Sequence, residues 1–226
     1  GLADNRGFNW VVPGPGADRM DNYGLFDAFE LSNCDLNKNT GDPFYKTVEY
    51  RDMHFNEEIY DRCEDNTNFS GNFQTERYFE KISPSIREDF TFKKAYLEPC
   101  QEFVDSIGGR DECIFLHVRR GSPNLTGRRG EKWSYQMVQE YHPLCKDDYY
   151  VRALKEFPED KTVIVVSDVI DWCKKQPYLQ GDRFQFSDSS YEVFGDGASV
   201  PYVDLCLMSL CGGAIIANSS LSWWGA

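Results

Sequence analysis

Cys113-Ile114-Phe115-Leu116-His117-Val118-Arg119-Arg120-Gly121 is the stretch from which the fold of this chain can be predicted. It begins as a short, mostly apolar run, which is typical of a buried strand over 113–118, and then continues into two arginines and a glycine. In an open α/β sheet, ligands bind just beyond the carboxyl ends of the strands, so paired arginines at that point would meet an anion. A solvated basic turn after an ordinary strand is the alternative, and this stretch alone favours neither.

Apolar runs alternate with helical stretches from this point to the end of the chain. Such an alternation indicates βαβ units and a mostly parallel, doubly wound sheet of the α/β class. We expect strands over 113–118, 162–167, 183–187 and 214–217, and helices near 146–157, directly after 168, over 201–211 and from 219 or 220.

Upstream of the strand, two helices are expected. Ser83 is the predicted N-cap of the first, with Pro84 at its first helical position, and the second covers 95–107 and stops at Gly108-Gly109. That double glycine is the candidate boundary between an N-terminal domain, 1–108, and a second domain, 109–226. Within the first domain, scattered glycine, proline, asparagine and aspartate over 1–70 favour strands and turns rather than long helices.

Composition limits the classes of partner. With 41% hydrophobic residues and no apolar run of about 18, the chain is predicted to be soluble and globular. It lacks the pattern of a signal peptide, and its first residues are not typical of a natural start, which suggests an upstream segment. A net charge of −13 argues against nucleic acid as a partner. A local cluster of Arg119, Arg120, Arg128, Arg129 and Lys132, with Glu131 as its one acid, suits a small phosphorylated ligand instead.

The eight cysteines show no C-x-x-C and no Cys/His cluster, which argues against a zinc site. Cys113, Cys206 and Cys211 lie in apolar runs and are predicted to be core residues. A reducing compartment is the simpler inference, although the even count leaves disulfides open.

Polar residues follow three of the predicted strands: 117–121, Ser167-Asp168 and Asn218-Ser219-Ser220. A helix that begins in Asn-Ser-Ser offers unpaired N–H groups to an anion, although ordinary N-capping explains the same residues. Together with the paired arginines, this arrangement favours a pyrophosphate site. The chain has no G-x-G-x-x-G, no P-loop and no pair of aspartates spaced i, i+2, so arginine and backbone donors, without a metal, would meet the phosphate charge.

Four motifs of this chain resemble, in order, those of the α-1,2-fucosyltransferases, glycosyltransferase family 11. They are Gly71-Asn72-Phe73-Gln74-Thr75-Glu76-Arg77-Tyr78-Phe79, the strand-end His117-Val118-Arg119-Arg120-Gly121, Val166-Ser167-Asp168 with Trp172-Cys173-Lys174, and Asp204 leading through Met208-Ser209 to Ile216–Ala226. The resemblance covers the chain from about residue 70 to its end.

The resemblance implies an inverting, metal-independent transfer of L-fucose from GDP-fucose to a sugar hydroxyl in α-1,2 linkage, with no cofactor besides that donor. It implies a GT-B-like fold of two Rossmann-like domains, with the acceptor side in 1–108 and the GDP-sugar in 109–226. Arg119 and Arg120 are the catalytic residues it implies, His117 and Asp204 would contact the guanosine, and Ser219 and Ser220 would bind phosphate. The implied donor-binding set is His117, Gly121, Ser167, Asp168, Asp204, Asn218, Ser219 and Ser220.

Structural explanations stand beside several of these assignments. Asp204 could complement the dipole of its helix, Ser167-Asp168 could cap the next helix, and Trp223 and Trp224 favour core or interdomain packing over sugar stacking. The chain also departs from the family where Ser122 replaces an aspartate, where an N-terminal G-x-G-N-Q is absent, and where it stops before a last helix.

The partners expected are therefore a GDP-sugar and a glycan acceptor, with no nucleic acid. The expected location is cytoplasmic, with the lumenal domain of a membrane-anchored Golgi enzyme as the alternative, because the family is often membrane-associated. Two other functions stay open: a transferase that uses another GDP-sugar, and a non-catalytic module that binds a sugar nucleotide or glycan.

Overall fold

The structure, a computed structural model, describes residues 11–13, 28–31, 35–37, 46–50, 54–65, 67–71, 73, 75–120, 143–187 and 200–226. By its internal contacts the chain divides into two compact units, Gly1–Lys93 and Lys94–Ala226. The functional domains proposed from the sequence, divided at residue 108, stay a prediction.

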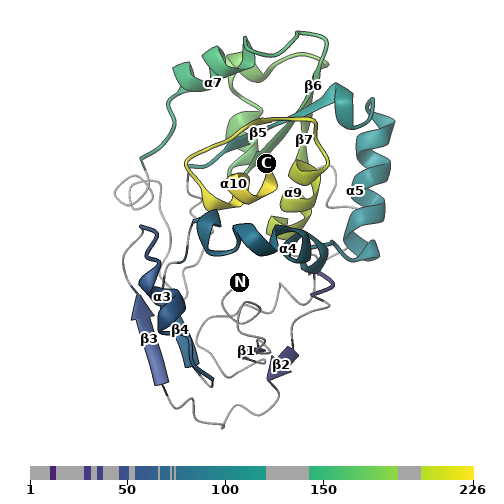
Figure 1. Cartoon of the computed structure of the whole chain (residues 1–226). Coiled ribbons are helices and arrows are strands. Elements are labelled where there is room, and N and C mark those ends of the chain that lie inside the picture. The colour runs from purple at the N-terminus through teal and green to yellow at the C-terminus, as the bar shows by residue number, and fades with distance from the viewer. Residues whose placement is uncertain are drawn as a thin grey trace. The chain divides into compact units, whose positions relative to one another are not determined.

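The first unit contains two small parallel pairs of strands (Figure 1). Strand β1 (Val11–Pro13) pairs with β2 (Asp35–Asn37), and β3 (Lys46–Tyr50) pairs with β4 (Thr67–Gly71). Aromatic rings pack around Tyr78, whose ring centroid lies 4.9 Å from that of Phe55 and 5.4 Å from that of Phe73. Among the described residues of this unit the helices are short, α3 (Glu58–Asp61) and α4 (Ser83–Asp89). In the described part of 1–70, where scattered turn residues predicted no long helix, α3 has four residues.

The predicted N-cap of α4 is wrong by one residue. Ser83 already has helical backbone angles and is the first residue of α4, while Ile82 occupies the N-cap position without a side-chain cap. The reason is local: a 3₁₀ turn, Glu80–Ile82, leads straight into the helix, so the chain is already coiling when it reaches Ser83. Pro84 stays within the first turn, where its missing N–H costs nothing.

A four-stranded parallel sheet forms the centre of the second unit. Its order is β7-β6-β5-β8, with β5 (Cys113–Val118), β6 (Thr162–Ser167), β7 (Phe184–Phe186) and β8 (Gly213–Ile215). Strands buried on both faces are continuous apolar runs, and all six residues of β5 are buried. The bounds predicted for β5 and β6 are confirmed, and β7 and β8 differ from prediction by one or two residues at their ends.

Helices cover both faces of this sheet (Figure 1). On one face, Leu116 of β5 packs in a buried cluster with Tyr150 of α7 (Asp147–Leu154) and Cys173 of α8 (Ile170–Cys173). Phe115 and His117, which alternate with Leu116 along β5, point to the other face, because successive side chains of a strand lie on opposite faces. There α9 (Val200–Ser209) packs against β5 and β6, and against α9 pack α5 (Lys94–Ser106) and α10 (Ser220–Gly225).

The predicted stop of the upstream helix is confirmed. Helix α5 is followed by Gly108 and Gly109, which have φ of 120° and 84°, the left-handed region that favours glycine. Because α5 packs against α9, the double glycine lies inside the second compact unit.

The order of the strands places a topological switch point at the carboxyl end of the sheet. From β5 the chain continues through α7 to β6 and then to β7, and it later returns on the other side of β5 as β8 and enters α10. Because α7 and α10 cover opposite faces, the connections from β5 and β8 diverge at their carboxyl ends. Such a switch point is where open α/β sheets bind ligands. The parallel α/β architecture is that predicted from the sequence and is compatible with a Rossmann-like fold.

Two further expectations can be compared with the structure. Cys113, Cys206 and Cys211 are buried, as predicted, and the seven cysteines in the described part of the chain are free thiols. No helix in the described ranges is both long and apolar enough to cross a membrane.

Candidate active site

The sheet brings the three predicted polar segments to one edge. Val118 lies opposite Ser167 in the β5–β6 pair, and Leu116 lies opposite Ile215 in the β5–β8 pair. The residues that follow these strands therefore emerge side by side at the carboxyl end of the sheet. Of the predicted site residues, only Gly121 lies outside the described part of the chain, as do Arg128, Arg129 and Lys132 of the predicted basic cluster.

Asp168 holds both arginine residues at this edge. Its Oδ2 accepts a hydrogen bond of 3.0 Å from Nη1 of Arg119, and its Oδ1 accepts one of 3.0 Å from the backbone N–H of Arg120. The side chain of Asp168 is 8% exposed and that of Arg119 is 30% exposed. Among the described residues Arg119 uses Nη1 alone, so the remaining N–H groups of its guanidinium can bind a further anion.

Arg120 has different surroundings. Its guanidinium carbon lies 3.9 Å from the ring centroid of Trp172, and its Nη1 lies 3.9 Å from Oδ1 of Asp147. Tyr178 donates a hydrogen bond of 3.3 Å to the same Oδ1 of Asp147. These partners come from α7, α8 and the 3₁₀ turn Pro177–Leu179, so Arg120 points to the α7 face of the sheet.

His117 is buried on the α9 face and is 2% exposed. Its Nδ1 has no hydrogen-bond partner in the described part of the chain. Burial, with a smaller contribution from the positive charge of Arg119, lowers the pKa of His117 to about 4. The imidazole is therefore neutral at pH 7 and keeps an unused polar atom at the end of β5, which is the arrangement expected of a ligand contact.

This pKa makes a prediction about stability. A histidine with a pKa near 6.5 when unfolded and about 4 when folded stabilises the fold fully above pH 6.5, and loses that contribution as the pH falls to about 4. Between pH 7 and pH 5 the loss should be about 2 kcal/mol. We expect His117→Gln, which cannot titrate there, to show a correspondingly flatter dependence in urea unfolding at several pH values. Parallel curves for the two proteins would contradict this.

Asp204 is also buried, at 5% exposed, and lies on α9. Since α9 packs against β5, Asp204 and His117 lie on the same side of the sheet. Asp204 is in the second turn of a helix that begins at Val200 rather than in the first turn, which weakens the explanation that it complements the helix dipole.

Asn218, Ser219 and Ser220 connect β8 to α10. Nδ2 of Asn218 donates a hydrogen bond of 3.1 Å to the carbonyl of Pro143. Ser219 is the N-cap residue of α10, but its hydroxyl makes no cap hydrogen bond, so simple capping does not account for its side chain. On the other strand, the hydroxyl of Ser167 accepts a hydrogen bond of 3.0 Å from the N–H of Val169. The N-cap residue of α8 is Val169, without a side-chain cap, so the alternative that Ser167-Asp168 caps this helix is wrong: the turn after β6 places the helix start one residue later.

Ser222 fixes the shape of this connection. Its fully buried hydroxyl accepts a hydrogen bond of 3.2 Å from the N–H of Ala217 and lies 3.2 Å from the carbonyl of Ser219. In the sequence, only its position in a serine-rich helix start pointed to this residue. Trp223 and Trp224, in contrast, are 59% and 54% exposed, so of the two alternatives, core or interdomain packing, the first is wrong and the second stays a prediction. On this short helix, Ser222 and Gly225 are the buried residues.

We expect Ser222→Ala to destabilise the protein by about 1–3 kcal/mol, because the buried N–H of Ala217 loses its acceptor. Ser106→Ala is the matched control, since Ser106 also donates to a backbone carbonyl, at 2.7 Å, but is exposed. Urea unfolding of the two variants measures the difference. Equal losses would show that Ser222 has no special role.

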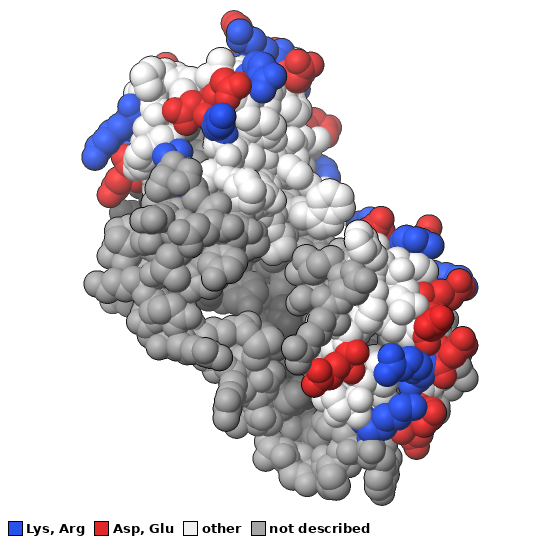
Figure 2. Space-filling view, turned by 90° about the vertical axis from the view of Figure 1, so that its left-hand side faces the viewer, with Lys and Arg blue, Asp and Glu red and all other residues white. Residues whose placement is uncertain are grey.

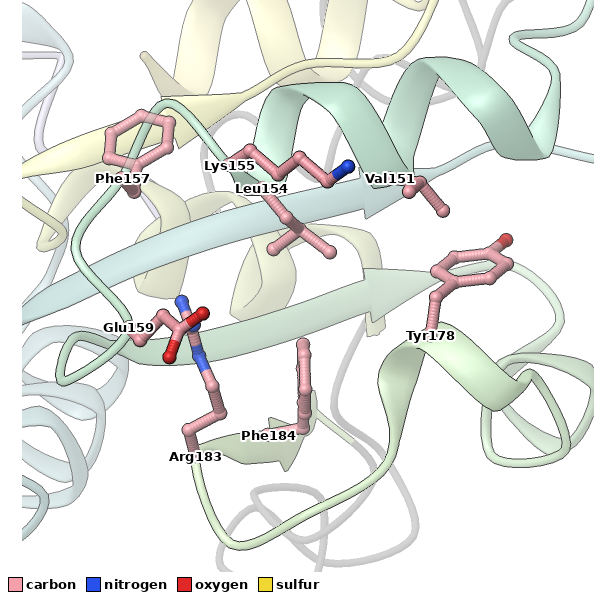
Figure 3. Close-up of a pocket in the computed structure, with 8 residues that line it drawn as sticks. All are labelled: Val151, Leu154, Lys155, Phe157, Glu159, Tyr178, Arg183 and Phe184. Carbon is pink, nitrogen blue, oxygen red and sulfur yellow. The ribbon is translucent and has the colours of Figure 1, made fainter.

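A cavity of about 450 Å³ lies elsewhere in the second unit (Figure 3). It contains none of the predicted site residues. Its lining comes from α7, from the segment after it, and from the region of β7, namely Val151, Leu154, Lys155, Phe157, Glu159, Tyr178, Arg183 and Phe184. The hydroxyl of Tyr178 points away from the other lining side chains, in keeping with its bond to Asp147.

The face of the molecule shown in Figure 2 carries described acidic and basic side chains interspersed.

Comparison with known proteins identifies the family. The model of "Glycosyl transferase family 11" matches residues 44–226, which include every residue of the candidate site. This chain belongs to glycosyltransferase family 11. The resemblance found in the four sequence motifs is thereby confirmed, and the family match extends it upstream from about residue 70 to residue 44.

Two Escherichia coli proteins illustrate the range of this family. An alpha-1,2-colitosyltransferase is 35% identical over 161 residues, which are 70% of this chain and 50% of that protein. The O-antigen biosynthesis glycosyltransferase WbnK is 30% identical over 124 residues, which are 50% of this chain and 39% of that protein. The matched regions thus span half or less of these relatives. No solved structure matches this family 11 chain.

Proposed function

We propose that this family 11 protein transfers L-fucose from GDP-fucose to a hydroxyl of a glycan in α-1,2 linkage. Family membership and the two relatives, both named as glycosyltransferases, support the general class. The α-1,2 linkage is that printed in the name of one relative. The fucosyl group and the GDP carrier rest on the motif resemblance and on the chemistry of the site.

The observation that carries the proposal is the state of Arg119. Asp168 binds Nη1 of its guanidinium, and no other described residue binds the remaining N–H groups, near the neutral His117 at the switch point of a parallel sheet. When the bond from sugar to diphosphate breaks, negative charge develops on the leaving phosphate. A pre-positioned guanidinium can bind that phosphate with two N–H groups and stabilise the charge. We assign this role to Arg119, and the other proposed catalytic arginine, Arg120, is considered below.

The base of the donor would contact the α9 face. Asp204 can accept two hydrogen bonds from guanine, from its ring N–H and its amino group, a pattern that adenine and uracil do not offer. His117, with an unpartnered Nδ1, would bind the same nucleoside. Around the start of α10, Ser219 and Ser220 would bind phosphate oxygens, while Gly121, Ser167 and Asn218 complete the proposed donor-binding set.

The proposed reaction is a direct displacement. The acceptor hydroxyl gives its proton to a general base and attacks the anomeric carbon as the bond to the diphosphate breaks, so the configuration inverts and GDP leaves. In this proposal, arginine and serine meet the phosphate charge, and no metal or cofactor is required. A GT-B-like arrangement, with the acceptor bound by the domain 1–108, and a cytoplasmic location complete the proposal.

A second candidate uses the same site with another sugar. The relative named as a colitosyltransferase is the specific reason to consider colitose as the transferred group. A non-catalytic sugar-nucleotide module is the third reading, since Ser122 stands where the family resemblance implies an aspartate.

A nucleotide panel tests the proposal. A ligand that binds only the folded protein stabilises it by about 2.7 kcal/mol at one hundred times its Kd. We expect GDP to raise the Tm and UDP, CMP and ADP to have little effect. Transfer assays with GDP-fucose, GDP-mannose and a nucleotide-activated colitose then separate the donors. GDP binding without turnover of any donor would favour the binding module, and no GDP binding would contradict all three readings.

A further inference from the structure

Arg120 is enclosed by protein groups where Arg119 is open. The two residues are adjacent in the chain, but their guanidinium groups have different partners. Arg120 is 19% exposed, and one face of its guanidinium lies against the indole ring of Trp172. A planar cation over an aromatic ring is attracted to the ring's negative face, more strongly where water is partly excluded.

Two further residues surround this contact. Asp147 places a carboxylate 3.9 Å from Nη1 of Arg120, and Tyr178 donates a hydrogen bond to that carboxylate. Burial and the nearby Asp147 carboxylate raise the pKa of Tyr178 above its usual value, so this hydroxyl keeps its proton and remains a donor. Since Asp147 is in the first turn of α7, it is also favourable there for the helix dipole.

We propose that Trp172, Asp147 and Tyr178 fix the position of the Arg120 guanidinium. Arg120, held in this way, positions the end of β5 so that Arg119 faces the donor diphosphate. Arg120 is thus a positioning residue, and Trp172 acts through it. Residues of α7 and α8 lie against this guanidinium, and Tyr178, from the turn after α8, binds the carboxylate of Asp147. The expected effect on sugar transfer rests on the proposed function, whereas the contact between Arg120 and Trp172 does not.

A double-mutant cycle on Trp172 and Arg120 tests this proposal. In the full protein, Trp172→Leu should lower kcat/KM with GDP-fucose and weaken GDP binding, each by about tenfold, as expected for a lost cation–π contact. Trp172→Phe keeps a ring beneath the guanidinium and should stay within about threefold of wild type. In an Arg120→Gln background, Trp172→Leu should cause little further loss, because its effect passes through Arg120. Asp147→Asn and Tyr178→Phe should give smaller losses of the same kind.

A matched control is available in the first unit. Arg77 lies over Phe55 at 3.9 Å, the same distance as in the pair of Arg120 and Trp172. Because Arg77 is exposed, Phe55→Leu should lower stability less than Trp172→Leu does, and it should leave the Kd for GDP unchanged. Losses that multiply in the Trp172→Leu/Arg120→Gln double variant, or a Trp172→Phe variant as poor as Trp172→Leu, would overturn the proposal.

The cycle is also measured in the free energy of unfolding, which keeps the two proposals separate. Coupling between Trp172 and Arg120 in urea unfolding, in a protein that binds no GDP, would support the contact and contradict the proposed function. GDP binding without any coupling between Trp172 and Arg120 would support the proposed function and contradict the contact. If Trp172→Leu does not fold, the same comparison is made with Asp147→Asn and Tyr178→Phe, each alone and combined with Arg120→Gln.

Discussion

Arg119→Ala should lower kcat/KM for sugar transfer by about 10²- to 10³-fold, the loss usual when one donor to a developing oxyanion is removed. In the structure this guanidinium is fixed by Asp168 through Nη1, while its other nitrogens are open in the described part of the chain. The fixed end reduces the reorganisation needed when the donor binds, and the open end supplies N–H groups to the leaving phosphate. The loss should therefore appear in kcat as well as in KM.

Two further variants test whether the loss of activity comes from the guanidinium of Arg119. Arg119→Lys keeps the charge but not the planar fork of N–H groups, so an intermediate loss is expected. Arg152→Ala removes an arginine that is 74% exposed and that, among the described residues, binds Asp148 of the same helix, and it should leave the rate unchanged. Thermal unfolding of each variant shows whether it is folded at the assay temperature. Transfer at the wild-type rate by Arg119→Ala would contradict the assignment of this residue.

The fold of the second unit was largely predictable from the sequence. The strand 113–118 is a short apolar run with a sharp polar end, and 162–167 is a second, so their bounds could be read directly. Strand β8 was less clear, because the sequence around it, Gly213-Ala214-Ile215-Ile216-Ala217, stays apolar beyond the last paired residue. The N-cap of α4 was missed because no sequence rule announces a 3₁₀ turn that leads directly into a helix.

The site was predictable only as a set of segments. The sequence order predicts that Arg119, Asp168 and Ser219 lie at one edge of a parallel sheet, because each follows the carboxyl end of a predicted strand. It could not show that Asp168 binds two arginines rather than a ligand, since that depends on the register between β5 and β6. Nor could it show which arginine side chain binds Asp168 and which lies against Trp172. The partner of Arg120 in α7, Asp147, looked like an ordinary first-turn acid.

Asp168→Asn should destabilise the protein by about 2 kcal/mol. Removing one partner of a fully buried ion pair costs roughly 3–5 kcal/mol, and the partial exposure of Arg119 reduces this figure. Asparagine can still accept the backbone hydrogen bond from Arg120 through its Oδ1, but its amide does not attract the Arg119 guanidinium. The substitution thus separates the charge of Asp168 from its hydrogen bond to the backbone.

Asp148→Asn is the control for this experiment. Oδ2 of Asp148 lies 3.3 Å from Nη2 of Arg152, but the two side chains are 67% and 74% exposed. Losing that ion pair should therefore lower the free energy of unfolding by less than about 0.5 kcal/mol. Urea unfolding of both variants gives the comparison, and transfer rates add a second one. If Asp168 orients Arg119, Asp168→Asn should also lower kcat, about tenfold, while adding little to the loss in an Arg119→Ala background. Should Asp168→Asn prove as mild as Asp148→Asn in both measurements, Arg119 would have to be held by other groups.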